Sequence, residues 1–319
     1  MTASALVLDD VVKRFGAFAA VDGLSFAVRK GEIFGFLGPN GAGKTTTLRM
    51  ILEIASPTSG RIEVLGSASA IKVRHKIGYL PEERGLYRKM KAADTIAYFA
   101  CLRGVPEKEA KTRALALLDR FGLGDFARAK NEALSKGMAQ KVQLLATIAH
   151  DPELLILDEP FSGLDPINQS TLEDLIRELK AQGKTIIFST HTMQHAERLC
   201  DRFLILAKGR KQFEGTLEEA RRKFPPQLLI RTSDDPARLE RAPGVAAITA
   251  RAGDGAERDY AIELKAGADP SAVLSAAFEA GIRMTRFEHA GASLHDIFVA
   301  LAGEEAPKAE PAVEGRAAA

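Results

Sequence analysis

Residues 38–46 read Gly38-Pro39-Asn40-Gly41-Ala42-Gly43-Lys44-Thr45-Thr46, and this stretch decides the fold. It fits the phosphate-binding loop pattern, in which glycines let the backbone curl so that several N–H groups point at phosphate oxygens. Lys44 adds a positive charge for the β- and γ-phosphates, and the Thr45 hydroxyl is of the kind that holds Mg²⁺. A plain glycine turn between a strand and a helix is the alternative.

The sequence on either side of this loop favours the phosphate site over the plain turn. The short apolar run 33–37 predicts a strand buried on both faces, and a helix is predicted from Gly43 to about Leu52. Such a helix directs the positive end of its dipole at the same anion. We therefore predict that residues 38–46 bind a phosphate chain.

Two adjacent carboxylates, Asp158 and Glu159, follow the second buried strand, predicted at 154–157. Ligands of open α/β sheets gather at the carboxyl ends of strands, and two unpaired carboxylates there would be costly. A complex of Mg²⁺ with phosphate gives Asp158 a reason to be there. Glu159 can then orient and deprotonate an attacking water. The alternative is that both acids cap the helix that follows.

Alternating elements between residues 1 and 224 predict an α/β domain with a mostly parallel core sheet and an antiparallel β subdomain. Strands are predicted at 6–12, 24–28, 33–37, 62–65, 76–80, 154–157, 185–189 and 203–207, and helices at 43–52, 136–149 and 166–182. The charged, helix-patterned block at about 90–145 predicts an inserted helical subdomain.

A second domain is predicted at 225–303, because Pro225-Pro226 is a plausible boundary. Strands are predicted at 228–232, 245–251, 259–264 and 283–288, and helices at 236–241, 271–280 and 294–301. The first six of these elements give the β-α-β-β-α-β order of a small ferredoxin-like α+β domain. The Ala-, Glu-, Pro- and Lys-rich stretch 304–319 predicts a disordered tail.

Composition limits the possible partners and compartments. A formal net charge of +2 over 319 residues gives no basic field for a nucleic-acid partner. The two cysteines, Cys101 and Cys200, lack metal-ligand spacing, so a reducing cytosol is expected. No apolar run reaches the roughly 18 residues of a membrane span. If the protein moves a solute across a membrane, another chain must supply the pore.

Taken together, these motifs resemble the ATP-binding cassette (ABC) transporter ATPases over roughly residues 5–217. The order of the motifs is the specific part of the resemblance. Gly78-Tyr-Leu-Pro81-Glu82 is similar to the family's Q-loop, Leu134-Ser-Lys-Gly-Met138 to its LSGGQ-like signature, Ser162-Gly-Leu-Asp165 to its D-loop, and Thr190-His191 to the segment with its switch histidine. The fold that this implies is a P-loop NTPase of ABC type.

The resemblance implies ATP as substrate, Mg²⁺ as cofactor, and a role for each matching residue. The resemblance assigns catalysis to Glu159, His191 and Lys44, and contact with the metal to Thr45, Asp158 and Glu82. ATP is bound by Phe15, which stacks on adenine, and by Gly38, Pro39, Asn40, Gly41, Ala42, Gly43, Lys44, Thr45 and Thr46. The ATP of a partner cassette is enclosed by the signature residues Ser135, Lys136, Gly137 and Met138, with Asp165 of the D-loop. Taken alone, Phe15 could be core, His191 structural, and Ser135 an ordinary helix cap.

Two motifs depart from the family pattern. Glu82 replaces the usual glutamine, and a carboxylate cannot donate an amide N–H. In the signature, Lys136 and Met138 replace a glycine and a glutamine, whereas Ser135 and Gly137 are kept. Because Lys44, Asp158, Glu159 and His191 are all present, we expect an active ATPase.

The expected function is therefore to power export of an ion or drug-like solute through a separate membrane permease, as a homodimer on the cytoplasmic face of the cell membrane. LPEERGLY, LSKGM and the appended domain resemble the sodium-extrusion and drug-efflux branch. For the appended domain, regulation or dimer support competes with a plain structural role. Alternatives for the whole chain are a non-transport cassette ATPase on ribosomes or DNA, or a regulatory nucleotide-binding module. A single P-loop, the lack of a coiled-coil or zinc insertion, and Glu159 argue against these.

Overall fold

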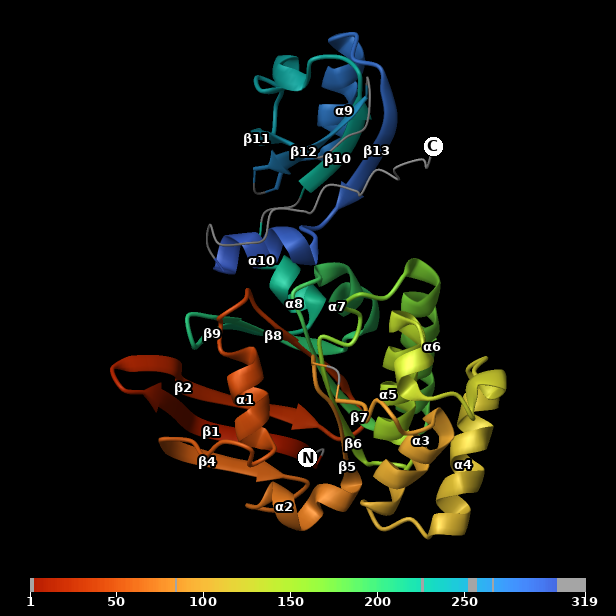
Figure 1. The fold of residues 1–319 in the computed structure, drawn as a ribbon. Helices are drawn as coiled ribbons and strands as arrows, with labels where there is room; N and C mark the ends of the chain where they lie inside the picture. Colours follow the sequence, from red (N-terminus) through yellow and green to blue (C-terminus); the bar gives the residue numbers. More distant parts are fainter. Residues whose placement is uncertain (1–2, 84, 225–226, 252–256, 266, 303–319) are drawn as a thin grey trace. The chain divides into compact units, whose positions relative to one another are not determined.

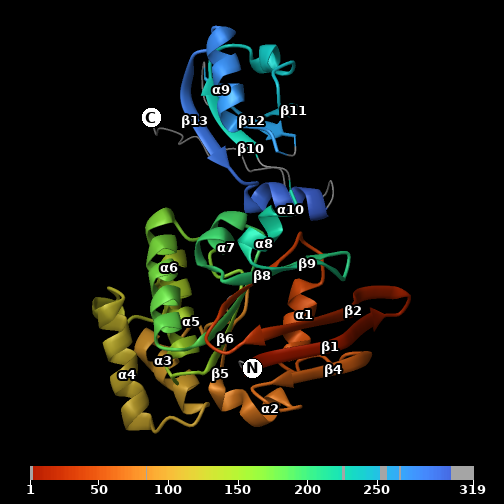
Figure 2. The ribbon, with the colours of Figure 1, turned by 180° about the vertical axis from the view of Figure 1, so that it is seen from behind.

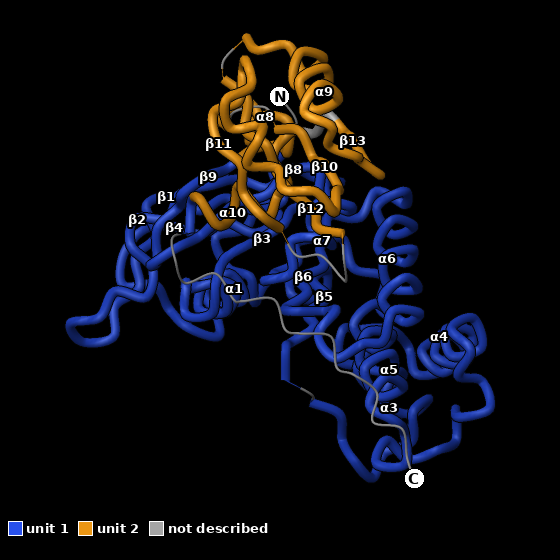
Figure 3. Tube along the Cα trace, turned by 90° about the horizontal axis from the view of Figure 1, so that it is seen from above, with its two compact units in different colours: residues 1–214, 301–319 blue, residues 215–300 orange. Residues whose placement is uncertain are grey.

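The computed structural model describes residues 3–83, 85–224, 227–251, 257–265 and 267–302, and divides into two compact units (Figures 1 and 3). The first unit runs to Glu214 and also takes in Leu301 and Ala302, and the second is Gly215–Ala300. The tail expected at 304–319 lies outside the described residues.

A six-stranded sheet forms the centre of the first unit, in the order β5-β6-β7-β3-β8-β9. Its strands are β3 (Ile33–Leu37), β5 (Ile77–Leu80), β6 (Leu154–Asp158), β7 (Thr185–Thr190), β8 (Arg202–Ala207) and β9 (Arg210–Gly215). The first five in this order run parallel to their neighbours. Both β3 and β6 are buried along their whole length, as expected for apolar runs covered on both faces. The predicted core sheet is thus confirmed.

An antiparallel sheet of order β2-β1-β4 forms the predicted β subdomain. Its strands, β1 (Ser4–Phe15), β2 (Phe18–Arg29) and β4 (Ser59–Val64), are longer than the sequence pattern indicated for the first two. Helix α1 (Lys44–Ile51) contributes Leu48, Met50 and Ile51 to one apolar core shared by both sheets of this unit. This core fixes the start of α1, and with it the loop that precedes it.

The predicted helical subdomain consists of α3 (Ala92–Cys101), α4 (Glu107–Arg120) and the capped helix α5 (Lys136–Ile148), which pack on one another. The buried residues of α4 are Ala110, Ala114 and Leu118, which recur at every fourth position, as an amphipathic helix requires. The view from behind shows α3 and α4 on the side of this unit away from the β1–β2–β4 sheet (Figure 2). The sequence also predicted α6 (Pro166–Ala181), but not α2 (Ala70–Val73), α7 (Met193–Leu199) or β9.

The second unit is an antiparallel sheet of order β11-β12-β10-β13. Its strands are β10 (Gln227–Thr232), β11 (Val245–Ala250), β12 (Arg258–Leu264) and β13 (Met284–Ala290), with α9 (Pro270–Glu279) before the last strand and α10 (Leu294–Ala302) after it. In chain order this sheet reads 2-3-1-4, which is the ferredoxin-like arrangement. The helix expected at 236–241 is only a 3₁₀ turn, Pro236–Leu239.

This second unit begins at Gly215, earlier than the boundary expected at residue 225. The short helix α8 (Leu217–Arg221) starts in a capping box formed by Thr216 and Glu219. Arg221 Nε then donates to the carbonyl of Ala292, which ties α8 to the start of α10. Residues ahead of Pro225-Pro226 therefore belong with the second unit.

Within the described ranges, no helix combines the length and apolar character needed to cross a bilayer. Cys101 and Cys200 are both free thiols.

Candidate functional site

The phosphate-binding loop joins β3 to α1, and two of its glycines stand against the backbone of neighbouring strands. Gly43 has a φ of +103°, and a Cβ there would lie 2.5 Å from the carbonyl oxygen of Ala20. A Cβ at Gly38 would lie 2.5 Å from the carbonyl oxygen of Leu206. Because backbone cannot yield as a side chain can, glycine is required at both ends of the loop.

Lys44 is buried within this loop, with 7% of its surface exposed. Its Nζ donates to the carbonyl oxygens of Gly38 at 2.6 Å and Pro39 at 3.2 Å, and it lies 4.0 Å from Glu159 Oε1. Burial lowers the pKa of the Lys44 ammonium, while the carboxylates of Glu159 and Asp158 oppose that shift. The Lys44 amine therefore lies at the centre of the loop, where a phosphate chain would bind.

Asp158 ends β6 and is almost fully buried beside α1 and β7. Its Oδ1 accepts from the hydroxyl of Ser189, and its carboxylate is also hydrogen-bonded by the Thr45 hydroxyl. Burial raises the pKa of Asp158, and these two hydrogen bonds work in the opposite direction. A hydroxyl and a carboxylate in contact are hard oxygen donors of the kind that Mg²⁺ takes alongside phosphate oxygens, so the pair fits the predicted metal site.

Glu159 is held in the left-handed region at φ +49°. Its N–H donates to Ser189, to the carbonyl oxygen at 3.2 Å and to Oγ at 3.1 Å. Its Oε1 lies 2.9 Å from Nδ1 of His191, and this hydrogen bond is the main cause that raises the pKa of the histidine. Strain of this kind is worth about 1–3 kcal/mol and persists where the surroundings over-determine it. The three predicted catalytic residues, Lys44, Glu159 and His191, thus lie in one cluster.

A cavity of about 430 Å³ opens beside this cluster, lined by loop residues, Glu82, Glu159, Phe15 and Phe18. The Phe15 and Phe18 side chains are 56% and 65% exposed, so neither belongs to the core. They pair across the tip of the β1–β2 hairpin and therefore share a face of it. Phe18 was not among the predicted site residues, although its position just across the hairpin turn from Phe15 was the available signal.

A second cavity, of about 350 Å³, extends from Asp158 and Glu159 toward the signature and the D-loop. Glu82, the Q-loop residue that was expected to face the metal, lines both cavities. Of the four predicted signature residues, only Lys136 lines this second cavity. Its side chain lies close against Gly163, whose φ is +70°.

The other signature residues and the D-loop aspartate lie outside both cavities. Ser135 is exposed and caps α5, with its Oγ accepting from the N–H of Met138 at 3.3 Å, as the sequence predicted. Asp165 caps α6 in the same way, accepting from the N–H of Asn168 at 2.9 Å. Within a single chain, Ser135, Gly137, Met138 and Asp165 line neither of the two cavities beside Glu159.

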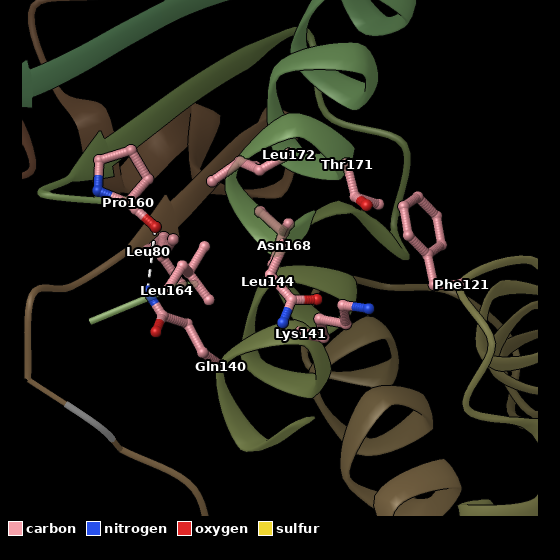
Figure 4. A pocket seen from close by; sticks show the side chains of 10 residues that line it. All are labelled: Leu80, Phe121, Gln140, Lys141, Leu144, Pro160, Leu164, Asn168, Thr171 and Leu172. Carbon is pink, nitrogen blue, oxygen red and sulfur yellow. Dashed lines mark hydrogen bonds between the residues drawn. The ribbon is translucent and has the colours of Figure 1, made fainter. Parts of the chain in front are cut away.

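A seam of side chains holds the signature helix against the segment that follows Glu159 (Figure 4). It encloses a small, mostly apolar pocket of about 20 Å³ between Leu144 of α5, Leu172 of α6 and Leu164 of the D-loop. Across the seam, Gln140 Nε2 donates to the carbonyl oxygen of Pro160 at 2.9 Å. Helix α5 is thereby linked directly to the residue that follows Glu159.

A groove of about 260 Å³ lies where the Q-loop meets α3 and α5, and Leu86, Phe99 and His150 are among its lining residues. Burial lowers the pKa of His150 to about 4, so this side chain is uncharged at neutral pH. Phe99 also belongs to a cluster with Tyr87 and Tyr98, whose ring centroids lie 5.7–6.3 Å apart. Both tyrosines are more than a third exposed, which makes this an apolar surface of the kind that partners cover.

Comparison with known proteins agrees with this site. Residues 21–162 match the family described as ABC transporter, and residues 215–302 match the C-terminal domain of DrrA1-3-like ATP-binding proteins. The uncharacterized ABC transporter ATP-binding protein YhaQ of Bacillus subtilis is 43% identical, over 93% of this chain and 98% of its own. Nod factor export ATP-binding protein I of Burkholderia orbicola is 39% identical, over 67% of this chain and 72% of its own.

Among solved structures, the dimeric post-hydrolysis state of the ATP-binding cassette MJ0796, bound to ADP and Pi, is similar with a TM-score of 0.62. It is 25% identical and covers 66% of this chain and 98% of its own. With a match to YhaQ that spans nearly the whole of both proteins, the chain belongs to the ATP-binding proteins of ABC transporters and is an ATPase subunit of that family.

Proposed function

We propose that this ATPase drives export of a solute through a separate membrane permease, with hydrolysis at the Lys44–Glu159–His191 cluster. The observation that carries the proposal is the contact of Lys44 and His191 with one carboxylate, Glu159, at the edge of the cavity of about 430 Å³. A cation, a general base and a histidine on one side of such a cavity are the parts that phosphoryl transfer to water uses.

ATP binding divides between the two ends of the larger cavity. The adenine lies against the exposed rings of Phe15 and Phe18, and the triphosphate lies on residues 38–46. Thr45 and Asp158, with Glu82 facing them, would hold Mg²⁺, which supplies charge neutralisation for the β- and γ-phosphates. Binding in this pose requires Lys44 to turn its ammonium from the carbonyls of its own loop toward the phosphates.

Hydrolysis is assigned to the residues that already touch one another. Glu159 accepts the proton of the attacking water, and the backbone hydrogen bonds to Ser189 fix its position. His191 holds the carboxylate from the other side and contacts the γ-phosphate. Lys44 neutralises charge that develops on the phosphate oxygens.

A second copy of the chain completes each site. Ser135, Gly137 and Met138 stand at the start of α5, where backbone N–H groups favour an anion, yet they line neither cavity beside their own Glu159. In the proposed head-to-tail dimer each signature, with Lys136, closes over the partner's ATP, and Asp165 lies at the contact. The similar cassette MJ0796, whose post-hydrolysis structure is dimeric, supports this arrangement.

Complementation between two inactive variants tests the shared site. Lys44→Ala removes the side chain that contacts the phosphates, and Ser135→Ala removes the hydroxyl of the signature. Each variant alone should therefore release little phosphate from ATP. In a mixed dimer one site combines the intact loop of one chain with the intact signature of the other. We expect the equimolar mixture to recover about a quarter of wild-type activity, as random pairing of two subunits predicts. If mixing restores nothing while both variants stay folded, the signature does not act across a dimer.

The permease is proposed to dock at the groove lined by Leu86 and Phe99 and at the neighbouring tyrosines, on the cytoplasmic face of the membrane. Export as the direction is supported by the name of the Nod factor relative. A photo-crosslinking residue at Leu102, which is 58% exposed on the end of α3, should label an integral membrane protein in native membranes. The matched control is Ile54, which is 62% exposed between α1 and β4. Equal labelling from both positions would reject this docking surface.

A further inference from the structure

A buried histidine on α7 takes no part in the mechanism above. His195 is 6% exposed, and its ring stacks on that of Phe161 with centroids 3.9 Å apart and planes 10° from parallel. Phe161 in turn meets Phe188 of β7 edge-on, with centroids 5.9 Å apart. The stacked pair, with Phe188 against its edge, joins α7, β7 and the segment after β6.

A buried carboxylate fixes the orientation of the histidine ring. Glu173 of α6 lies with Oε1 2.9 Å from His195 Nδ1, and its Oε2 accepts from Arg177 at 3.2 Å. A carboxylate paired with an arginine accepts hydrogen bonds, so Nδ1 of His195 carries the proton. Arg198 adds a second positive group 3.8 Å from Glu173. The imidazole is thus held in its plane by a charged network and by the stack at the same time.

The two ends of this stack lie close in sequence to the two halves of the catalytic contact. Phe161 follows Glu159 by 161 − 159 = 2 residues, and His195 follows His191 by 195 − 191 = 4 residues. Between them, Glu159 and His191 make their own contact at 2.9 Å. Two separate segments of chain are therefore joined twice, once by the catalytic contact and once by the buried stack.

We infer that His195 is a positioning residue, which with Phe161 and Glu173 sets the distance between Glu159 and His191. The inference rests on the proposed function of that contact. A stack of rings alone resists sliding less than a hydrogen bond does. The carboxylate of Glu173 accepts a hydrogen bond from the imidazole and so blocks its rotation. Together the two interactions fix both the distance and the angle between the His195 and Phe161 rings. General bases lose efficiency steeply with displacement, because a shift of about 1 Å costs on the order of a hundredfold in rate.

The test separates the stack from the hydrogen bond in the full-length chain. His195→Leu removes both interactions, His195→Phe keeps a ring against Phe161, and Phe161→Leu removes the stack from the other side. We expect His195→Leu and Phe161→Leu each to lower kcat for ATP about tenfold or more. KM and the affinity for ATP should stay within about twofold, because the binding residues are elsewhere. His195→Phe should recover only part of the lost kcat, because it keeps a ring against Phe161 but has no N–H for Glu173.

The double variant and a neighbour on the same helix decide between positioning and general damage. If the pair acts as a unit, His195→Leu with Phe161→Leu is no slower than either single variant. Gln194→Ala, at an exposed position next to His195 on α7, should match the wild type. The inference is overturned if folded variants keep their kcat, if ATP affinity falls in parallel with kcat, or if the two losses multiply. A wild-type chain that binds ATP and releases no phosphate would instead reject the proposed function, and the inference with it.

Discussion

The two units of the chain differ in whether they bury charged side chains. The first buries Lys44, Asp158 and Glu159 together at the phosphate site, and it also buries the paired Glu173 and His195 and, before β3, Glu32, which pairs with Arg202. In the second, among the described residues, the buried polar side chains are uncharged (Gln227 and Thr232), and charged pairs such as Arg231 with Asp259 reach solvent. Burying a charge is costly unless partners compensate it, so a cluster of buried charges marks the place where chemistry justifies the cost. The described residues of the second unit contain no such buried cluster.

The largest expected effect lies at the centre of the buried cluster. Glu159→Gln keeps the size of the side chain but removes its ability to accept a proton, so turnover should fall by about a hundredfold or more. Phosphate release from ATP measures the loss. The variant should still bind ATP and accumulate as an ATP-bound dimer in size-exclusion chromatography. Hydrolysis by this variant at the wild-type rate would exclude Glu159 as the general base and would weaken the contrast between the units.

A smaller effect is expected at the exposed rings of the first unit. Phe15→Ala and Phe18→Ala should each weaken ATP binding about tenfold, which corresponds to the loss of one aromatic surface for a base. Binding of inorganic tripolyphosphate should not change, because it has no base to stack. Phe278→Ala provides the matched control, since this phenylalanine is 69% exposed on α9 of the second unit. Equal losses for ATP and tripolyphosphate would exclude base stacking.

The His191–Glu159 contact should make stability depend on pH. The folded pKa of His191 is raised above its ordinary value of 6.5, so its contribution is complete below about 6.5 and is lost as pH rises through the raised value. The wild type should therefore exceed His191→Ala in unfolding temperature by more at about pH 6 than at about pH 8.5. His295→Ala, at an exposed position on α10, is the control. A difference that does not vary with pH would contradict this account.

The smallest effect is expected in the second unit. Arg231 Nε and NH2 donate to Asp259 at 2.7 Å and hold the pKa of that carboxyl below its usual range. Surface pairs of this kind contribute about 0–1 kcal/mol, so Arg231→Ala should change the free energy of unfolding by no more than that. Chemical denaturation measures it, and ATPase activity should not change. A large loss of either would mean that charges of the second unit matter as much as those of the first.

Local patterns were enough to predict the parts of the fold that short segments determine. The run at 33–37, the glycines around Lys44 and the acids after 154–157 each specify an element and its end, and all three appear where expected. The ferredoxin-like order followed from the sequence of strand and helix patterns. By contrast, α7 and β9 are short and carry weak periodicity, so neighbouring elements decide their structure.

The site likewise divides into residues that motifs predict and contacts that depend on packing. A motif places Lys44, Asp158, Glu159 and His191 near one another, because strand ends of a parallel sheet meet at one edge. The stack of His195 on Phe161 and the path of Lys136 over Gly163 depend on how separate elements pack. No spacing along the chain reports such contacts, so sequence reasoning missed them.

The glycines at either end of the phosphate loop have a consequence for how such a protein can change during evolution. A side chain at Gly38 or Gly43 would press on the main chain of Leu206 or Ala20, so the loop cannot drift without disturbing the strands beside it. Glu159, in contrast, can be exchanged for an amide of equal size. A lineage could therefore abandon hydrolysis by one substitution while nucleotide capture persists, since the latter is built into the architecture itself.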